Sequence, residues 1–270
     1  MSVFASFFDY GFLKTALLAV LLIMPLFSLL GTMVVNRGMA FFSDALGHSA
    51  LTGMGIGVLC GLTDVTPAML IFAVLFALGL NVVRHSRAAS TDTIIGVFSS
   101  CGVALGLVLL SRGGFAKYQT ILIGDILNVT PTDLWMLGGA LVTMIAVWLL
   151  CFNGFHAVAI SPSLARSKGI AVRFYDNLFV VVTAVTVMLS IRIVGLLLIN
   201  AMLILPAAAA RNVARNMRGY HGYALLFGVF SGVVGLFLSY FHAAAAGPMI
   251  VLVAAVVFFG TYFIGKSERN

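Results

Sequence analysis

Long apolar stretches separated by short polar connections make up most of the 270-residue chain. Most of them approach the ~20 residues that an α-helix needs to cross about 30 Å of hydrocarbon. The pattern therefore predicts an all-α polytopic membrane protein with about nine transmembrane helices. The connection at Arg192 is short, so eight spans with one re-entrant stretch are also possible. The apolar stretches are 11–35, 43–61, 66–83, 93–111, 132–152, 174–191, 193–210, 222–241 and 247–265.

The composition excludes a soluble protein. Hydrophobic residues make up 62% of the chain and charged residues only 9%, whereas soluble domains carry about 25% charged residues. The mean hydropathy is +1.15. The first apolar stretch is longer than the ~7–15 apolar residues of a signal peptide, so we expect it to remain as a span. Cys60, Cys101 and Cys151 each stand alone in an apolar stretch, so we expect them to be small core residues.

Basic residues stand between the apolar stretches, in alternate connections. By the positive-inside rule these connections face the cytoplasm, and the amino terminus lies outside. The net charge of +7 therefore orients the helices and does not indicate nucleic-acid binding. Arg112 and Lys117 are exceptions in a predicted outer connection, beside a predicted short outer helix at 118–130. The orienting residues are Arg37, Arg84, Arg87, Arg166, Lys168, Arg173, Arg211, Arg215, Arg218, Lys266 and Arg269.

Glycines recur at every fourth position in several predicted helices. This spacing lets helix backbones approach closely, which supports helix association in lipid. Flexibility that suits a moving part is an alternative interpretation of the same glycines. Pro25 and Pro206 are predicted to interrupt the hydrogen bonding of their helices. The glycines are Gly53, Gly57 and Gly61, then Gly102 and Gly106, and then Gly228 and Gly232.

The segment FFSDALGHSALTG, residues 41–53, places two ionisable side chains inside a predicted span. Asp44 and His48 are four residues apart, so they face the same way on a helix. A lone charge at mid-bilayer costs at least ~2.5–3.5 kcal/mol, so such residues often mark a pathway. Helix capping by Ser43 or Asp44 would also explain the acid, and a hydrogen bond in the core would explain the histidine. A carboxylate and a neutral imidazole together suit Zn²⁺ and, less tightly, Mn²⁺ or Fe²⁺.

Two ligands do not hold a metal ion selectively, and the sequence offers one further candidate. His242, at the outer end of the eighth apolar stretch, is this third potential ligand. His85, His156 and His221 fall in predicted cytoplasmic loops and are poorer candidates. The chain contains no HExxH, GxSxG or P-loop motif. We therefore expect no enzyme activity in this chain, and any ATP must be bound by another chain.

Several segments resemble, in order and spacing, those of the zinc/manganese-type ABC transporter permeases. The first, NRGMAFFSDALGHSALTGMGIG, matches the second helix that is the signature of this family. The others are STDTIIGV, LIGDILNVTPTDL, ISPSLARSKGI, IVGLLLINAMLILPAAAAR and AGPMIVLVAAVVFF. The resemblance covers nearly the whole chain and is strongest to metal-uptake permeases of the ZnuB type.

The resemblance implies a metal-type ABC importer permease fold, with residues 1–270 as a single transmembrane permease domain. It implies that Asp44 and His48 line the metal route, that His242 adds a coordinating side chain, and that Met202 belongs to a gate. Zn²⁺ or Mn²⁺ is then a transported substrate, and no cofactor is permanently bound. The implied location is the bacterial cytoplasmic (inner) membrane, which the chain crosses several times.

The segment ISPSLARSKGI resembles the cytoplasmic coupling helix of the family, which fits a groove of the ATPase. It lies at about 160–172. The implied partners are a pair of cytoplasmic ATP-binding subunits, an extracytoplasmic metal-binding protein, membrane lipid and a second permease copy, either identical or a sister chain. The residues that match the coupling pattern are Ser161, Pro162, Ala165 and Gly169.

One departure from the family pattern concerns the fourth helix. Some zinc-type relatives carry a histidine where this chain has Ser99, Ser100 and Cys101, so Cys101 is a conceivable substitute ligand. The sequence favours zinc import, with manganese or iron as the alternative cargo. A secondary transporter driven by protons through Asp44 and His48, and an intramembrane enzyme, are the alternatives from other functional classes. No convincing inverted repeat supports the first of these, and no nucleophile–base set supports the second.

Overall fold

The computed structural model describes residues 11–86, 89–111 and 124–267, and the regular structure in these ranges is entirely helical. Nine long helices are present in the described ranges, together with the short helix α8 and one 3₁₀ turn. The elements are α2 (Gly11–Asn36), α3 (Phe42–Leu59), α4 (Thr66–His85), α5 (Thr91–Ser111), η2 (Ile126–Asn128), α7 (Pro131–Ile160), α8 (Pro162–Ser167), α9 (Val172–Val194), α10 (Leu196–Val213), α11 (Met217–His242) and α12 (Ala246–Ser267).

These helices coincide with the predicted apolar stretches, which confirms an all-helical membrane protein. Seven helices in the described ranges are long and apolar enough to cross a membrane. The other two long helices are α10, whose apolar part is shorter, and α3, which carries the polar residues of the signature segment. Gly195, with φ of 88°, separates α9 from α10 by a single residue, so the tight junction joins two distinct helices. Pro25 and Pro206 lie inside α2 and α10 as predicted.

The predicted short outer helix is only partly covered by the described residues. Its second half forms the turn η2, where the Asp125 carboxylate accepts hydrogen bonds from the amides of Leu127 and Asn128. The amide of Asp125 also donates to the carbonyl of Arg192, which ties this segment to the junction of α9 and α10. Residues 112–123, which include Arg112 and Lys117, lie outside the described ranges.

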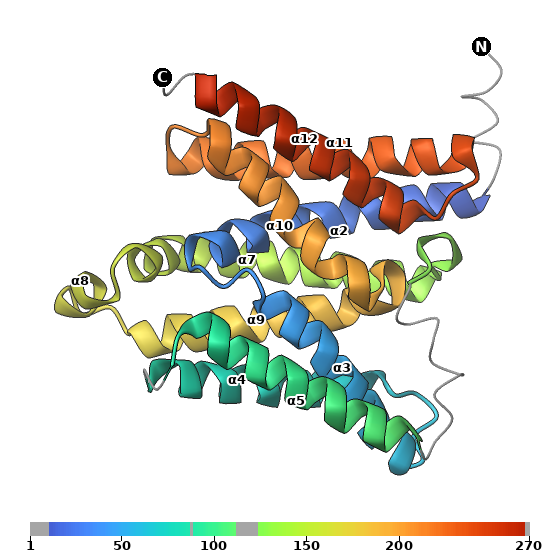
Figure 1. Ribbon diagram of the computed structural model, residues 1–270, viewed down its shortest axis with the longest axis horizontal. Helices are drawn as coiled ribbons and strands as arrows, with labels where there is room; N and C mark the ends of the chain where they lie inside the picture. The colour runs from blue at the N-terminus through green and yellow to red at the C-terminus, as the bar shows by residue number, and fades with distance from the viewer. Residues whose placement is uncertain (1–10, 87–88, 112–123, 268–270) are drawn as a thin grey trace.

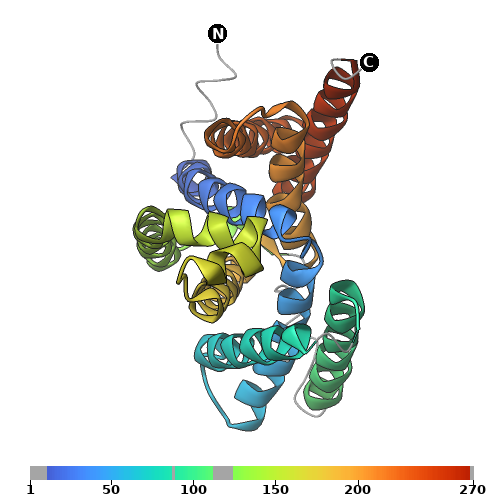
Figure 2. The same ribbon diagram turned by 90° about the vertical axis from the view of Figure 1, so that its left-hand side faces the viewer.

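The helices form two groups joined through a central layer. Figure 1 shows α10, α11 and α12 on one side, α3, α4 and α5 on the other, and α2, α7 and α9 between them, an arrangement that Figure 2 shows from the side. α5 packs on α3 and α4, whereas α3 also contacts α9 and α10. α8 projects from one end of the bundle (Figure 1).

Glycines allow the close helix contacts that their spacing predicts. A Cβ added at Gly106 of α5 would lie 2.6 Å from the Cβ of Leu51 and 2.8 Å from the amide nitrogen of Thr52 in α3. One added at Gly53 would lie 2.7 Å from the Cα of Met69 in α4. Gly61 differs because its added Cβ would meet nothing within 4 Å, and its φ of +71° marks a turn.

Replacing Gly106 with alanine is expected to lower the stability of the folded permease by about 1–3 kcal/mol, because the new methyl group overlaps the α3 backbone. Gly96 is the matched control on the same helix, since an added Cβ there meets nothing within 4 Å. Gly96→Ala should be neutral or slightly stabilising because alanine favours the helix. Thermal unfolding of both purified variants in detergent measures the difference. Equal midpoints would contradict the packing role of Gly106.

The expected burial of the cysteines is wrong for two of them. Cys60 and Cys101 are exposed and Cys151 is half-buried in the described chain. An apolar stretch that crosses a membrane presents one side to lipid or to another subunit, so an apolar sequence context does not by itself indicate burial inside the chain.

Candidate functional site

Asp44 and His48 lie together on one face of α3, as their spacing predicts. The Nε2 atom of His48 is 3.4 Å from Oδ2 of Asp44, and the side chains are 24% and 38% exposed respectively. The other ring nitrogen of His48, Nδ1, is buried and has no hydrogen-bond partner among the described residues. The pair therefore presents a carboxylate and an imidazole on a partly open face, which is the donor combination of a transition-metal site.

The start of α3 argues against helix capping as the role of Asp44. The helix begins after Phe41 without a hydrogen bond from any capping side chain. Ser43 donates its hydroxyl hydrogen instead to Oδ1 of Asn200 in α10, at 2.5 Å. Neither Ser43 nor Asp44 therefore caps the helix by a side-chain hydrogen bond, and Asp44 in the first turn of α3 still complements the helix dipole.

α3 begins deep in the bundle, away from the end where α8 lies. Figure 1 shows its first turn near the middle of the layer of long helices. Ser43 contacts Asn200, one turn into α10, and a Cβ added at Gly47 would lie 3.5 Å from the side chain of Leu196, the first residue of α10. The pair of Asp44 and His48 therefore lies at depth and not at the end where the basic connections gather.

The structure does not bring a third predicted ligand to this pair. His242 is the exposed last residue of α11. Among the described residues, no group of three or more His, Cys, Asp or Glu side chains is placed to hold a metal ion, so neither His242 nor Cys101 completes a cluster within one chain. Met202 lies two residues after Asn200 and is 1% exposed in the core. The ligand role of His242 and the gate role of Met202 remain predictions.

The segment that resembles a coupling helix does form a helix, although α8 is shorter than the predicted range. The Ser161 hydroxyl accepts a hydrogen bond from the amide of Leu164, and Pro162 occupies the first turn, where no amide hydrogen is needed. Ala165 is 2% exposed against Val158 and Val172. Gly169 has φ of +77°, which favours glycine after the helix. These four residues therefore shape the short helix that projects from the bundle, and its contact with an ATPase remains a prediction.

Three histidines occupy helices and not the predicted loops. His156 in α7 and His221 in α11 are 8% and 7% exposed, and their Nε2 atoms are 2.8 Å apart. The Nδ1 atom of His221 is 2.9 Å from the Thr32 hydroxyl of α2. His85 ends α4 and lies 3.0 Å from the Asp176 carboxylate. The loop assignment is wrong because α4, α7 and α11 continue past their apolar stretches. α7 and α11 also bury His156 and His221 against each other.

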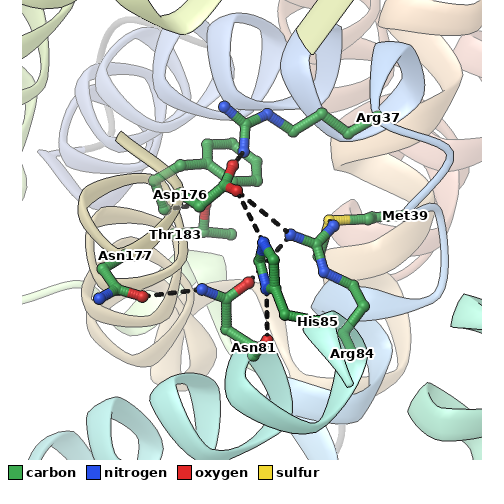
Figure 3. A network of polar contacts seen from close by, with 9 residues as sticks. Arg37, Met39, Asn81, Arg84, His85, Asp176, Asn177 and Thr183 are labelled. Atoms are coloured by element: carbon green, nitrogen blue, oxygen red, sulfur yellow. Dashed lines mark hydrogen bonds and ion pairs between the residues drawn. The ribbon is translucent and has the colours of Figure 1, made fainter. Parts of the chain in front are cut away.

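A polar network that the sequence did not reveal lies between α4, α9 and the connection before α3 (Figure 3). The Asp176 carboxylate accepts hydrogen bonds from Arg37 and His85, and Arg84 lies 4.0 Å away. Nη1 of Arg84 also lies 2.8 Å from the sulfur of Met39, close to the start of α3. The basic residues were visible in the sequence only as markers of orientation, and nothing local linked them to Asp176.

The comparisons with known proteins agree with this fold and with the resemblance. The model of the ABC 3 transport family matches residues 9–265. The chain belongs to the ABC 3 transport family. Members of this family are permease subunits of ABC transporters, so the chain is a multi-pass transport protein of the membrane and carries no ATPase domain of its own.

Individual family members are similar over nearly their whole length. The chain is 33% identical to the high-affinity zinc uptake system membrane protein ZnuB of Haemophilus influenzae, over 89% of this chain and 92% of that protein. It is 31% identical to the manganese transport system membrane protein MntC of Listeria innocua, over 96% and 93% of the two chains. The structure of PsaBC from Streptococcus pneumoniae in complex with Fab superposes with a TM-score of 0.85 and 30% identity, covering 97% of this chain and 96% of that one.

Proposed function

We propose that this permease carries zinc into the bacterial cytoplasm as the membrane subunit of an ATP-driven importer. The observation that carries the proposal is the pair of Asp44 and His48, with Nε2 and Oδ2 3.4 Å apart on a partly open face of α3. A carboxylate oxygen and a neutral imidazole replace part of the hydration shell of a divalent cation. Two ligands also bind weakly enough for release, which transport requires.

A second copy of the permease would complete the coordination of the ion. One chain offers two donors on an open face, and no third His, Cys, Asp or Glu joins them among the described residues. A second copy facing the first across the same surface would contribute a further aspartate and histidine to a shared route. The projecting helix α8 would contact a cytoplasmic ATP-binding subunit in each half, and an extracytoplasmic metal-binding protein would deliver the ion.

Manganese is the second candidate cargo. Relatives similar over almost the whole chain are named as manganese transporters, as MntC of Listeria innocua is. Mn²⁺ prefers oxygen donors more strongly than Zn²⁺ does, whereas imidazole suits zinc well. The one-to-one ratio of carboxylate to imidazole at Asp44 and His48 therefore favours zinc.

The cargo is measured directly by uptake of radioactive ⁶⁵Zn in bacterial cells that lack their own zinc importers. The permease is co-expressed with its ATPase and binding protein, and Mn²⁺ is added in 100-fold excess. We expect zinc uptake to persist under this competition. Competition by manganese as effective as that by unlabelled zinc would assign the cargo to manganese or to a broader set. Uptake that persists without the ATPase subunit would instead establish a proton-driven secondary transporter.

A further inference from the structure

A positively charged cavity opens at the end of the bundle where α8 lies. Its volume is about 520 Å³, within the range of small-ligand sites. Its lining includes four arginines and one aspartate, so positive charge is in clear excess. These charged residues are Arg37, Arg84, Arg166, Arg173 and Asp176.

The floor of the cavity is built from the polar network of Figure 3. The side chains of Arg37 and Asp176 are 5% and 6% exposed, and they are paired. The Arg37 guanidinium lies 4.5 Å above the ring of Phe179, which fixes its plane. Its Nε and Nη2 atoms are buried and have no hydrogen-bond partners in the described part of the chain. These two nitrogen atoms have no appreciable accessible surface, so an occupant of the cavity meets the partly exposed Arg84 and not these donors.

The rim of the cavity adds two further cations. Arg166 on α8 and Arg173 on α9 are exposed, and within the described part of the chain neither has an ion-pair partner. Large apolar side chains flank these positions in the sequence. Ile160 is 72% exposed and Phe174 is 58% exposed. An occupant therefore meets positive charge inside the cavity, and the exposed Phe174 directly follows the rim residue Arg173 in the sequence.

We infer that this cavity binds the phosphate group of an anionic phospholipid from the membrane leaflet on the α8 side. A phosphodiester matches the charges of Arg84, Arg166 and Arg173 in the cavity lining, while the acyl chains would contact exposed apolar side chains such as Phe174, the residue after Arg173. Basic cavities between helices at the cytoplasmic surface are typical headgroup sites. The assignment does not depend on which metal the permease carries, so it can fail while the proposed transport function stands.

The test uses the intact permease–ATPase complex in detergent and counts retained lipid by native mass spectrometry. Phosphatidylglycerol and phosphatidylcholine are supplied in equal amounts. The variant R166Q/R173Q removes the rim charges, R166K/R173K preserves them, and R211Q/R218Q removes two exposed arginines that lie outside the cavity lining. Each basic side chain near an anionic lipid contributes a factor of about five, so we expect roughly 25-fold weaker retention of phosphatidylglycerol only in R166Q/R173Q.

Several outcomes would overturn the inference. Retention of phosphatidylglycerol in R166Q/R173Q at the wild-type level is one, provided that the variant elutes as the assembled complex. Equal retention of phosphatidylcholine is another. If millimolar inorganic phosphate displaces the lipid, and phosphate alone binds to the complex as well as the lipid does, the cavity is a site for a free anion. Lipid retention by the isolated permease but not by the assembled complex would show that the ATPase fills the cavity.

Discussion

We expect zinc uptake to fall at least about tenfold in Asp44→Ala and in His48→Ala. Mutation of a residue that only hydrogen-bonds to a metal ligand already lowers metal affinity or activity by about 10- to 100-fold. Both side chains are partly exposed, and neither the start of α3 nor its packing depends on them. The amount of folded permease in the membrane should therefore stay near the wild-type level. Uptake of ⁶⁵Zn, normalised to the amount of permease in the membrane, measures the effect.

The control for this experiment is Asp92→Ala. Asp92 is also an acidic residue in the first turn of a helix, α5, and it is exposed. Its replacement should leave uptake unchanged. In the same assay, His242→Ala tests the predicted ligand role of His242 at the end of α11. If Asp44→Ala and His48→Ala transport zinc at the wild-type rate, the pair is structural and the proposed route lies elsewhere.

The second large effect is expected at Asp176, where Asp176→Asn should destabilise the permease by about 3–5 kcal/mol. The substitution leaves Arg37 and Arg84 without their shared carboxylate, and the side chain of Arg37 is 5% exposed. Burial already lowers the pKa of Arg37, against the opposing attraction of Asp176. Without that attraction the buried cation loses its main compensation. Thermal unfolding of the purified variant, together with the yield of folded protein, measures the loss.

Asp64→Asn is the matched surface control, since Asp64 is exposed and bonds only to the neighbouring Thr66 among the described contacts. Its effect should stay below about 1 kcal/mol. Adding Arg37→Gln to Asp176→Asn should cost less than the sum of the two single substitutions, because the uncompensated charge is then removed. An Asp176→Asn variant that unfolds at the wild-type temperature would contradict the role of the network.

The sequence was sufficient for the fold because a membrane restricts the possibilities to helices whose length matches the bilayer. Each apolar stretch corresponds to a helix. The short connection at Arg192 also joins two helices, because α9 ends just before Gly195, whose φ is 88°. The pattern did not show that α7 extends to Ile160 or that α11 begins at Met217. Polar residues such as His156 end an apolar stretch without ending a helix.

The candidate site was predictable only where it is local in sequence. Asp44 and His48 are one helical turn apart, so helix geometry alone brings them together. Arg37 and Asp176 are separated by 139 positions, and the partners of a buried ion pair leave no periodic signal. The depth of α3 was hidden for the same reason, because it depends on the contact between Ser43 and Asn200, which lie in different helices.

The mid-depth start of α3 has an electrical consequence. If half of the transmembrane voltage falls between the outer surface and the pair, a divalent cation that binds Asp44 and His48 from outside, as proposed, gains energy from that voltage. Moving one elementary charge across the full voltage is worth about 2.3 kcal/mol per 100 mV, so two charges over half the distance gain a similar amount. An interior-negative membrane would therefore tighten occupation of the pair from outside by roughly 50-fold per 100 mV. The membrane voltage would then fill the site, and ATP hydrolysis would be needed mainly to empty it.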